Sequence, residues 1–118
     1  MKLLVTGGAG FIGSNFVHHV YKMRPDWNIT VFDKLTYAGN YKNIDSLDKK
    51  RVHFIEADIC DQGAIDKAIS ENDAVVHFAA ESHNDNSIHS SWPFVNTNII
   101  GTYNILEAAR IHNKRLHH

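Results

Sequence analysis

The sequence predicts an α/β fold built on a doubly wound parallel sheet, and two observations support this prediction. Short apolar or β-branched runs alternate with stretches of helical periodicity along the 118 residues. A glycine-rich turn, "GGAGFIG", also lies between the first apolar run and the first helical stretch. Such alternation is typical of successive strand–helix units, whose strands pair in parallel.

The first half of the chain is expected to form three of these strands. "KLLVT" (2–6) is predicted to be a buried strand, and "FIGSNFVHHVYKM" (11–23) a helix that follows the glycine turn. "NITVFD" (28–33) forms the second strand and "VHFIEAD" (52–58) the third, with a polar loop and a short helix over 37–50 between them. Four apolar positions fall on one face of the first helix: Ile12, Phe16, Val20 and Met23.

The second half continues the same pattern. "QGAIDKAISEN" (62–72) predicts a short helix with Ile65, Ala68 and Ile69 inward, and "DAVVHFAA" (73–80) a fourth strand. Pro93 can open a long helix through "FVNTNIIGTYNILEAARIHN". The apolar positions that form one stripe on this helix are Val95, Ile99, Tyr103 and Leu106.

The last six residues, "NKRLHH", indicate the end of a helix running into the first residues of a fifth strand. The two histidines could also be the remnant of a tag. The expected sheet therefore has four parallel strands in the order 3-2-1-4 and is truncated before the fifth. Residues 1–118 would form one incomplete domain of a larger fold.

Composition excludes several classes of partner. The 12 basic and 13 acidic residues leave a formal charge of -1, so neither a nucleic-acid nor a membrane partner is expected. No run approaches the roughly 18 to 20 apolar residues of a membrane span. The single cysteine, Cys60, rules out an internal disulfide, which suits a reducing compartment. The cytoplasm is the expected location.

The glycine turn has the spacing of a dinucleotide-binding loop. Gly7, Gly10 and Gly13 recur every third residue between a strand and a helix, and Asp33 ends the next strand 20 positions beyond Gly13. The first two glycines permit a tight turn and close approach to a pyrophosphate, and the third packs the helix on the sheet. A mononucleotide loop is excluded, because Ser14 stands where its lysine is required. The sequence therefore predicts a Rossmann-type domain.

Asp33 favours NAD over NADP as the cofactor. A carboxylate at this strand end accepts hydrogen bonds from the ribose hydroxyls and repels a 2'-phosphate. Lys34 opposes this preference, since it could pair with that phosphate. Asp58 and Ile59 end the third strand, where Asp58 could accept from the adenine amine while Ile59 covers the ring. Asp58 could equally cap the following turn.

"HFAAESHNDNS" (77–87) ends the fourth strand on the side where ligands bind in doubly wound sheets. Ala79 and Ala80 are small enough to let the nicotinamide half pass, and polar groups follow from Ser82 onward. An ordinary polar turn is the alternative. The nine histidines lack the context of a metal site, so no metal is expected. Cys60 has no nearby histidine in the sequence and is predicted to be an inert thiol.

These motifs together resemble a known family. "TGGAGFIG" is similar to the glycine signature of extended short-chain dehydrogenases, and "DKLTYAGN" (33–40) resembles a segment of dTDP-glucose 4,6-dehydratases. "ADICD", "AAESH" and "NTNIIGTYNILEAAR" follow in that family's order and spacing. The family's Val-Asp-Arg-Ser after "AAESH" is replaced here by Asn84-Asp85-Asn86-Ser87, which puts in doubt a charged contact at position 86.

The resemblance implies a set of contacts. Phe11 and Ile12 would lie beside the pyrophosphate, Asp58 and Ile59 at the adenine, and Thr97 against NAD from the long helix. Ser82 would also touch the sugar nucleotide. The residues around the adenosine ribose would be Asp33, Lys34, Leu35 and Thr36. The residues lining the path to the nicotinamide would be Phe78, Ala79, Ala80, Glu81 and Ser82.

The resemblance also implies a reaction. The family converts dTDP-glucose to dTDP-4-keto-6-deoxyglucose and water in deoxysugar (rhamnose) synthesis, by moving a hydride from C4 to NAD and back to C6. It is therefore a lyase, expected to act as a homodimer. Its Thr-Asp-Glu group and Tyr-x-x-x-Lys pair are absent here, so no catalytic residue and no substrate domain are expected in this chain. Two alternatives remain: another NAD-dependent sugar-nucleotide epimerase or decarboxylase, and a non-enzymatic NAD-binding module.

Overall fold

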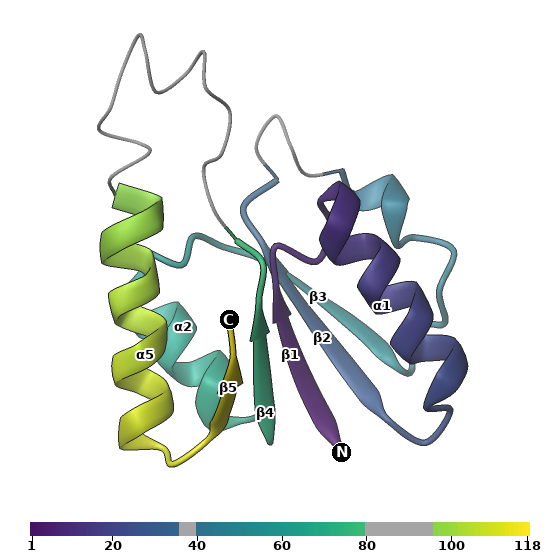
Figure 1. Ribbon diagram of the computed structural model, residues 1–118. Helices are drawn as coiled ribbons and strands as arrows, with labels where there is room; N and C mark the ends of the chain where they lie inside the picture. Colours follow the sequence, from purple (N-terminus) through teal and green to yellow (C-terminus); the bar gives the residue numbers. More distant parts are fainter. Residues whose placement is uncertain (36–39, 80–95) are drawn as a thin grey trace, which may run out of the picture.

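The computed structural model describes residues 1–35, 40–79 and 96–118. Its strands are β1 (Lys2–Thr6), β2 (Asn28–Asp33), β3 (Val52–Glu56), β4 (Ala74–His77) and β5 (Arg115–His117). Within the described residues these five strands form one parallel sheet in the order β3-β2-β1-β4-β5 (Figure 1). The predicted order 3-2-1-4 is therefore confirmed.

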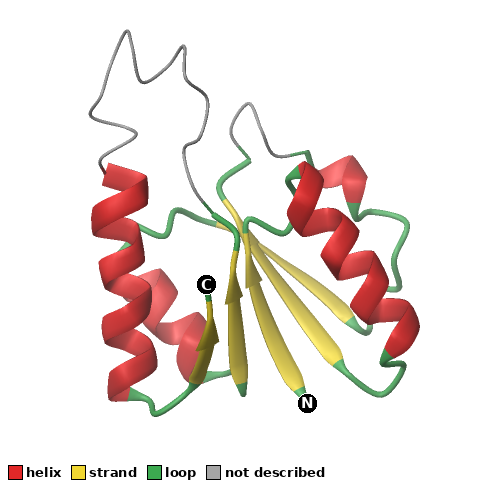
Figure 2. Cartoon of the chain, viewed as in Figure 1, coloured by secondary structure: helices red, strands yellow, loops and turns green. Residues whose placement is uncertain are grey.

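Helices cover both faces of the sheet, as the doubly wound prediction requires (Figure 2). On one face lie α1 (Phe11–Met23) and the short 3₁₀ helix η1 (Tyr41–Asn43). The other face carries α2 (Gln62–Ser70) and α5 (Thr102–Ile111). A π-helical segment, η2 (Asn96–Gly101), leads directly into α5.

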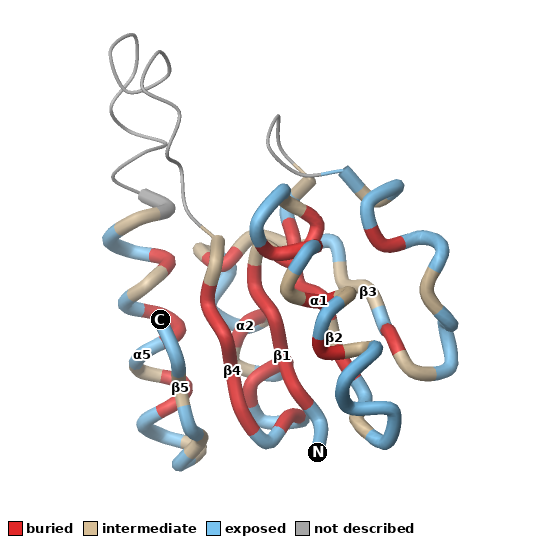
Figure 3. Tube along the Cα trace, turned by 45° about the vertical axis from the view of Figure 1, so that its right-hand side comes forward, coloured by how far each residue is buried: buried red, intermediate tan, exposed pale blue. Residues whose placement is uncertain are grey.

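The core consists of two layers of side chains that are separated by the sheet. In β1, Leu3 and Val5 pack with Val17 of α1, whereas Leu4 points to the opposite layer with Ile65 of α2. Figure 3 shows β1 and β4 as almost continuously buried tubes. Central parallel strands are covered on both faces, which explains why these runs are apolar throughout rather than alternating.

Two strands end earlier than predicted. β3 ends at Glu56 instead of residue 58, because the Asp58 carbonyl accepts the Asp61 N–H and begins a turn. β4 ends at His77, since its partner β1 ends at Thr6 and offers no further extended backbone. The predicted last residue of that strand, at position 80, lies outside the described residues.

The buried face of α1 differs from the predicted stripe. Val20 is buried and Phe16 packs against the core, but Ile12 and Met23 are exposed. The face that meets the sheet consists of Gly13, Ser14, Val17 and Val20. An apolar pattern does not include glycine and serine, although small residues at these positions let the helix pack closely on the sheet.

The predicted inward positions of α2 are confirmed, whereas the predicted stripe of α5 faces solvent. Ile65, Ala68 and Ile69 are all buried. Tyr103 has an exposed fraction of 60%, and Ile99, which lies in the preceding η2, one of 62%. The positions of α5 that meet the core are instead Asn104, Ile105, Ala108 and Ala109. Pro93 and Val95 lie outside the described residues, so the predicted start of this helix stays a prediction.

The chain reaches further than the predicted four strands. Asn113, with a φ of 54°, turns the backbone after α5, and the Lys114 N–H donates to the Ala109 carbonyl at 2.9 Å. β5 then pairs in parallel with β4, with Leu116 opposite Val75. The expectation that the sheet ends before its fifth strand is therefore wrong, since the three residues of β5 belong to it. The prediction that "NKRLHH" contains the first residues of a fifth strand is confirmed.

Candidate functional site

The glycine turn joins β1 to α1 at the carboxyl edge of the sheet. Gly7 has a φ of 70°, and its N–H donates to the Phe32 carbonyl of β2 at 2.8 Å. A Cβ at Gly7 would lie 2.6 Å from the backbone nitrogen of Ala79, which follows β4. A Cβ at Gly13 would meet the carbonyl oxygen of Gly7. Neither position has room for a side chain: Gly7 lies in the tight turn with a positive φ, and Gly13 packs the start of α1 against the backbone of that turn.

The amino end of α1 is suited to an anion. Gly10 occupies the N-cap position, and over the described residues no side chain caps this end and no acidic residue stands in the first turn. Phe11 and Ile12 begin the helix with exposed fractions of 79% and 68%. Backbone N–H groups and the helix dipole both favour negative charge at such an end. Phe11 and Ile12 therefore stand beside the position where the sequence predicts a pyrophosphate.

Asp33 anchors the end of β2 to the glycine turn. One carboxylate oxygen accepts the Ala9 N–H at 2.9 Å, and the other accepts the Leu35 N–H at 2.8 Å. The residue is only 8% exposed, so it is not a solvated strand cap. Leu35 has a φ of 57°, a strained conformation for a branched side chain that its bond to Asp33 helps to maintain. The carboxylate is thus held rigidly beside the turn.

Lys34 and Asp58 meet across the ends of β2 and β3. The Lys34 ammonium lies 3.4 Å from a carboxylate oxygen of Asp58, and the side chains are 45% and 33% exposed. The other carboxylate oxygen of Asp58 accepts the Cys60 N–H at 2.9 Å. Burial acts to raise the pKa of Asp58, but the Cys60 hydrogen bond and the Lys34 charge together lower it. Asp58 therefore caps the turn, one of its two predicted roles, and stays ionised.

The remaining predicted site residues lie near the carboxyl ends of the strands or outside the described residues. The Ile59 side chain is 4% exposed and packs against Gly101, so it belongs to the core. The Phe78 ring lies 5.3 Å from that of Phe16, and the Ala79 N–H donates to the Thr6 hydroxyl at 3.3 Å. Four residues lie outside the described ranges: Thr36, Ala80, Glu81 and Ser82. Thr97 belongs to η2, and its side chain is likewise not described.

A buried histidine, to which the sequence pattern assigns no role, links β1 to α5 through hydrogen bonds. His77 is 5% exposed, and its ring nitrogens make hydrogen bonds with the hydroxyls of Thr6 at 2.6 Å and Thr102 at 3.1 Å. Burial lowers the pKa of His77 to about 4, with the nearby His118 as the second cause. The imidazole is therefore neutral at neutral pH. The position of this histidine inside the apolar run "AVVHF" could have indicated its burial, because a central parallel strand has no solvent-facing side.

Cys60 behaves as predicted for an unreactive thiol. Burial and then the charge of Asp58 raise its pKa to about 11. The reactive form of a cysteine is the thiolate, which is scarce at neutral pH under these conditions.

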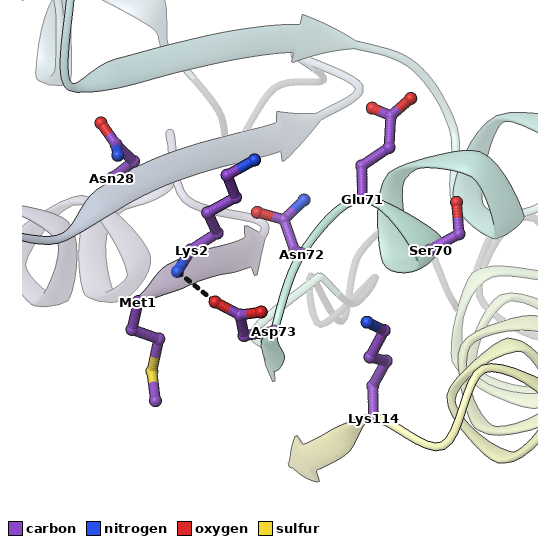
Figure 4. Close-up of a pocket in the computed structure, with 8 residues that line it drawn as sticks. All are labelled: Met1, Lys2, Asn28, Ser70, Glu71, Asn72, Asp73 and Lys114. Atoms are coloured by element: carbon purple, nitrogen blue, oxygen red, sulfur yellow. Dashed lines mark hydrogen bonds between the residues drawn. The ribbon is translucent and has the colours of Figure 1, made fainter.

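One open pocket lies at the amino ends of the strands, on the opposite side of the sheet from the glycine turn. It has a volume of about 430 Å³ and surrounds the starts of β1, β2 and β4 (Figure 4). The Lys2 backbone N–H donates to the Asp73 carboxylate there at 2.8 Å. Its lining residues are Met1, Lys2, Asn28, Ser70, Glu71, Asn72, Asp73 and Lys114. Ligands of doubly wound sheets bind at the carboxyl edge, so this pocket is not the predicted site.

Within residues 1–35, 40–79 and 96–118, no group of three or more histidine, cysteine, aspartate or glutamate residues is arranged to hold a metal ion. No helix in these ranges has both the length and the apolar character needed to cross a membrane.

Known proteins share both the sequence and the fold. A dTDP-glucose 4,6-dehydratase of Mycobacterium tuberculosis is 51% identical over 118 residues, which are all of this chain and 35% of that protein. The crystal structure of DesIV, a dTDP-glucose 4,6-dehydratase from Streptomyces venezuelae with NAD bound, matches 98% of this chain and 38% of its own at 44% identity and a TM-score of 0.89. The chain thus spans little more than a third of these relatives.

A second class of enzyme shares the fold at lower identity. The UDP-glucose 4-epimerase of Thermus thermophilus, in a structure with NAD, matches 96% of this chain and 35% of its own at 32% identity and a TM-score of 0.82. The resemblance to dTDP-glucose 4,6-dehydratases is confirmed by the higher identities. The family model described as GDP-mannose 4,6 dehydratase matches residues 4–118. This chain therefore belongs to the GDP-mannose 4,6-dehydratase family.

Proposed function

We propose that this chain binds NAD at the carboxyl edge of its sheet and is the cofactor-binding part of a dTDP-glucose 4,6-dehydratase. The observation that carries the proposal is the position of the Asp33 carboxylate, which is hydrogen-bonded to Ala9 inside the glycine turn. This bond brings the group that would bind the ribose next to the helix end that would bind the pyrophosphate. NAD, when bound, supplies a reversible hydride acceptor.

The contacts proposed for NAD follow the order of the sheet. Backbone N–H groups at Phe11 and Ile12 bind the pyrophosphate, and Asp33 accepts from the ribose hydroxyls. Asp58 contacts adenine, and Ile59 contributes through its main chain because its side chain is buried. The ribose surroundings are completed by Lys34, Leu35 and Thr36, and the nicotinamide path by Phe78, Ala79, Ala80, Glu81, Ser82 and Thr97. Ser82 also touches the sugar nucleotide.

The chemistry of this proposal lies outside residues 1–118. The M. tuberculosis relative is named dTDP-glucose 4,6-dehydratase and is almost three times as long as this chain. We therefore expect the substrate domain and the catalytic acid, base and tyrosine beyond these residues, and no turnover by residues 1–118 alone. The proposed enzyme is a lyase of deoxysugar synthesis. Cys60, as the single cysteine, suits the reducing cytoplasm.

Isotope transfer distinguishes the dehydratase from its alternatives. Protein expressed from the complete reading frame is incubated with dTDP-glucose deuterated at C4, and the product is analysed by NMR and mass spectrometry. A dehydratase returns the label to C6 with loss of water. An epimerase, which the T. thermophilus similarity keeps as the second candidate, retains the label at C4 without loss of water. Binding of NAD without any product would support the non-enzymatic module and contradict the proposal.

We also propose that the full-length protein is a homodimer that uses α5. Tyr103 and Leu106 are exposed on the side of this helix opposite its core residues, and Ile99 of η2, the segment that leads into α5, is exposed as well. Three large apolar side chains in a row on a surface helix are typical of a face that packs against another helix. A second copy of the same helix satisfies this requirement by two-fold symmetry.

A further inference from the structure

Three charged residues lie at or just beyond the carboxyl ends of β2 and β3, where the adenosine ribose is proposed to bind. Asp33 is immobilised by two backbone N–H groups and is nearly buried. Lys34, the next residue, directs its ammonium away from the chain of β2 to the Asp58 carboxylate beyond β3, at 3.4 Å. The net charge of the three is -1 when all are ionised. Asp58 is ionised at neutral pH, because its hydrogen bond from Cys60 and the Lys34 charge outweigh the effect of burial and lower its pKa.

This arrangement bears on the difference between NAD and NADP. NADP differs by a 2'-phosphate, which adds a charge of roughly -1.5 to -2 at neutral pH. Asp33 repels that group, but an adjacent lysine could compensate by binding it, so Asp33 alone does not settle the selectivity. In the structure the lysine is already paired with a second carboxylate. A phosphate that binds the ammonium would therefore compete with Asp58 for it and would be repelled by that carboxylate as well.

We propose that Asp58 is a specificity-determining residue, which selects NAD over NADP by holding Lys34 in an ion pair and so keeping it from a 2'-phosphate. This inference rests on the proposed function, since it requires a dinucleotide at this edge. It assigns Asp58 a role in addition to its contact with adenine. The pair is partly exposed, so the effect is a preference rather than an absolute barrier.

The test compares two small probes that carry only the adenosine end of the cofactors. Protein from the complete reading frame, freed of bound cofactor, is titrated calorimetrically with AMP and with adenosine 2',5'-bisphosphate. Asp58→Asn removes the charge but keeps an oxygen that can accept the Cys60 N–H. The affinity for the bisphosphate relative to AMP should rise about threefold to tenfold, the range expected when one partly exposed charge acts on a dianion. The ratio for NADP over NAD should rise in parallel.

Two further variants separate the ion pair from general charge. Asp61→Asn changes the net charge by the same amount, and its side chain can still cap α2 at the Ala64 N–H, as asparagine is as good a cap as aspartate. This variant should leave the ratio unchanged. In the double variant Lys34→Met with Asp58→Asn, the gain should disappear, because the released ammonium is missing.

The outcomes are distinguishable from failure of the proposed function. If the unaltered protein and Asp61→Asn both bind neither AMP nor NAD, the dinucleotide site itself is wrong, and the inference is overturned with it. If both bind AMP but Asp58→Asn leaves the ratio unchanged, only the inference is overturned. The same holds if the double variant retains the gain, since the effect would then not act through Lys34.

Discussion

At the scale of single residues, Gly13 is under the strictest constraint in the glycine turn. A Cβ there would meet the Gly7 carbonyl, which is part of the backbone and cannot rotate away as a side chain could. We expect Gly13→Ala to lower the free energy of unfolding by about 1–3 kcal/mol, the usual effect of overpacking. It should also weaken NAD binding, because the helix end moves away from the turn. Urea denaturation and NAD titration measure the two effects.

Gly63 provides the matched control for this substitution. It lies in the first turn of α2, and a Cβ there would come no closer than 3.7 Å to the Asp61 carboxylate. Gly63→Ala should therefore raise stability by about 0.5–1 kcal/mol through helix propensity. Equal destabilisation by the two substitutions would show that contact with the Gly7 carbonyl is not the reason for a glycine at position 13.

At the scale of elements, α5 presents its apolar stripe to solvent and its small residues to the core. We expect Leu106→Glu to convert the proposed dimer of the full-length protein to a monomer without loss of fold, because Leu106 is half exposed and lies opposite the buried positions. Sedimentation velocity measures the change. Gln62→Glu adds the same charge to the exposed start of α2 and should leave the dimer intact. A dimer that survives Leu106→Glu would place the interface elsewhere.

Elements also differ in how far the sequence could predict them. The bounds of β1, α1 and β2 were predicted to the residue, because an apolar run, a glycine turn and a helical repeat mark them locally. The buried face of α5 was not predicted correctly. Its predicted stripe of Ile99, Tyr103 and Leu106 has a clear helical period, but periodicity shows only that an apolar face exists. Which face is buried depends on small residues such as Ala108, which is buried, and Gly101, where a Cβ would meet the Ile59 side chain.

At the scale of the whole molecule, His77 makes stability depend on pH. Its pKa falls from 6.5 to about 4 on folding, so the unfolded state binds a proton more readily than the folded one. Its contribution to stability is complete above pH 6.5, decreases as the pH falls to about 4, and is constant below. The loss due to this group is about 3 kcal/mol across that window. Urea denaturation at several pH values should show it.

Substitution of His77 tests whether this residue causes the pH dependence of stability. His77→Gln can keep hydrogen bonds to Thr6 and Thr102 but cannot titrate. Its free energy of unfolding should vary less between pH 6.5 and 4 than that of the unaltered protein. His53→Gln, at an exposed position of β3, should leave the pH dependence as it was. An unchanged slope in His77→Gln would contradict the assignment.

The sequence by itself determined the strand–helix alternation, the glycine turn and the place of Asp33 at a strand end, because each depends on neighbours within a few residues or on a fixed spacing. The tertiary structure decided the rest. The hydrogen bond of His77 to Thr6 joins positions 71 residues apart, and the pairing of Lys34 with Asp58 depends on β2 and β3 lying side by side. No local pattern encodes such contacts, since they exist only once the sheet brings distant strand ends together.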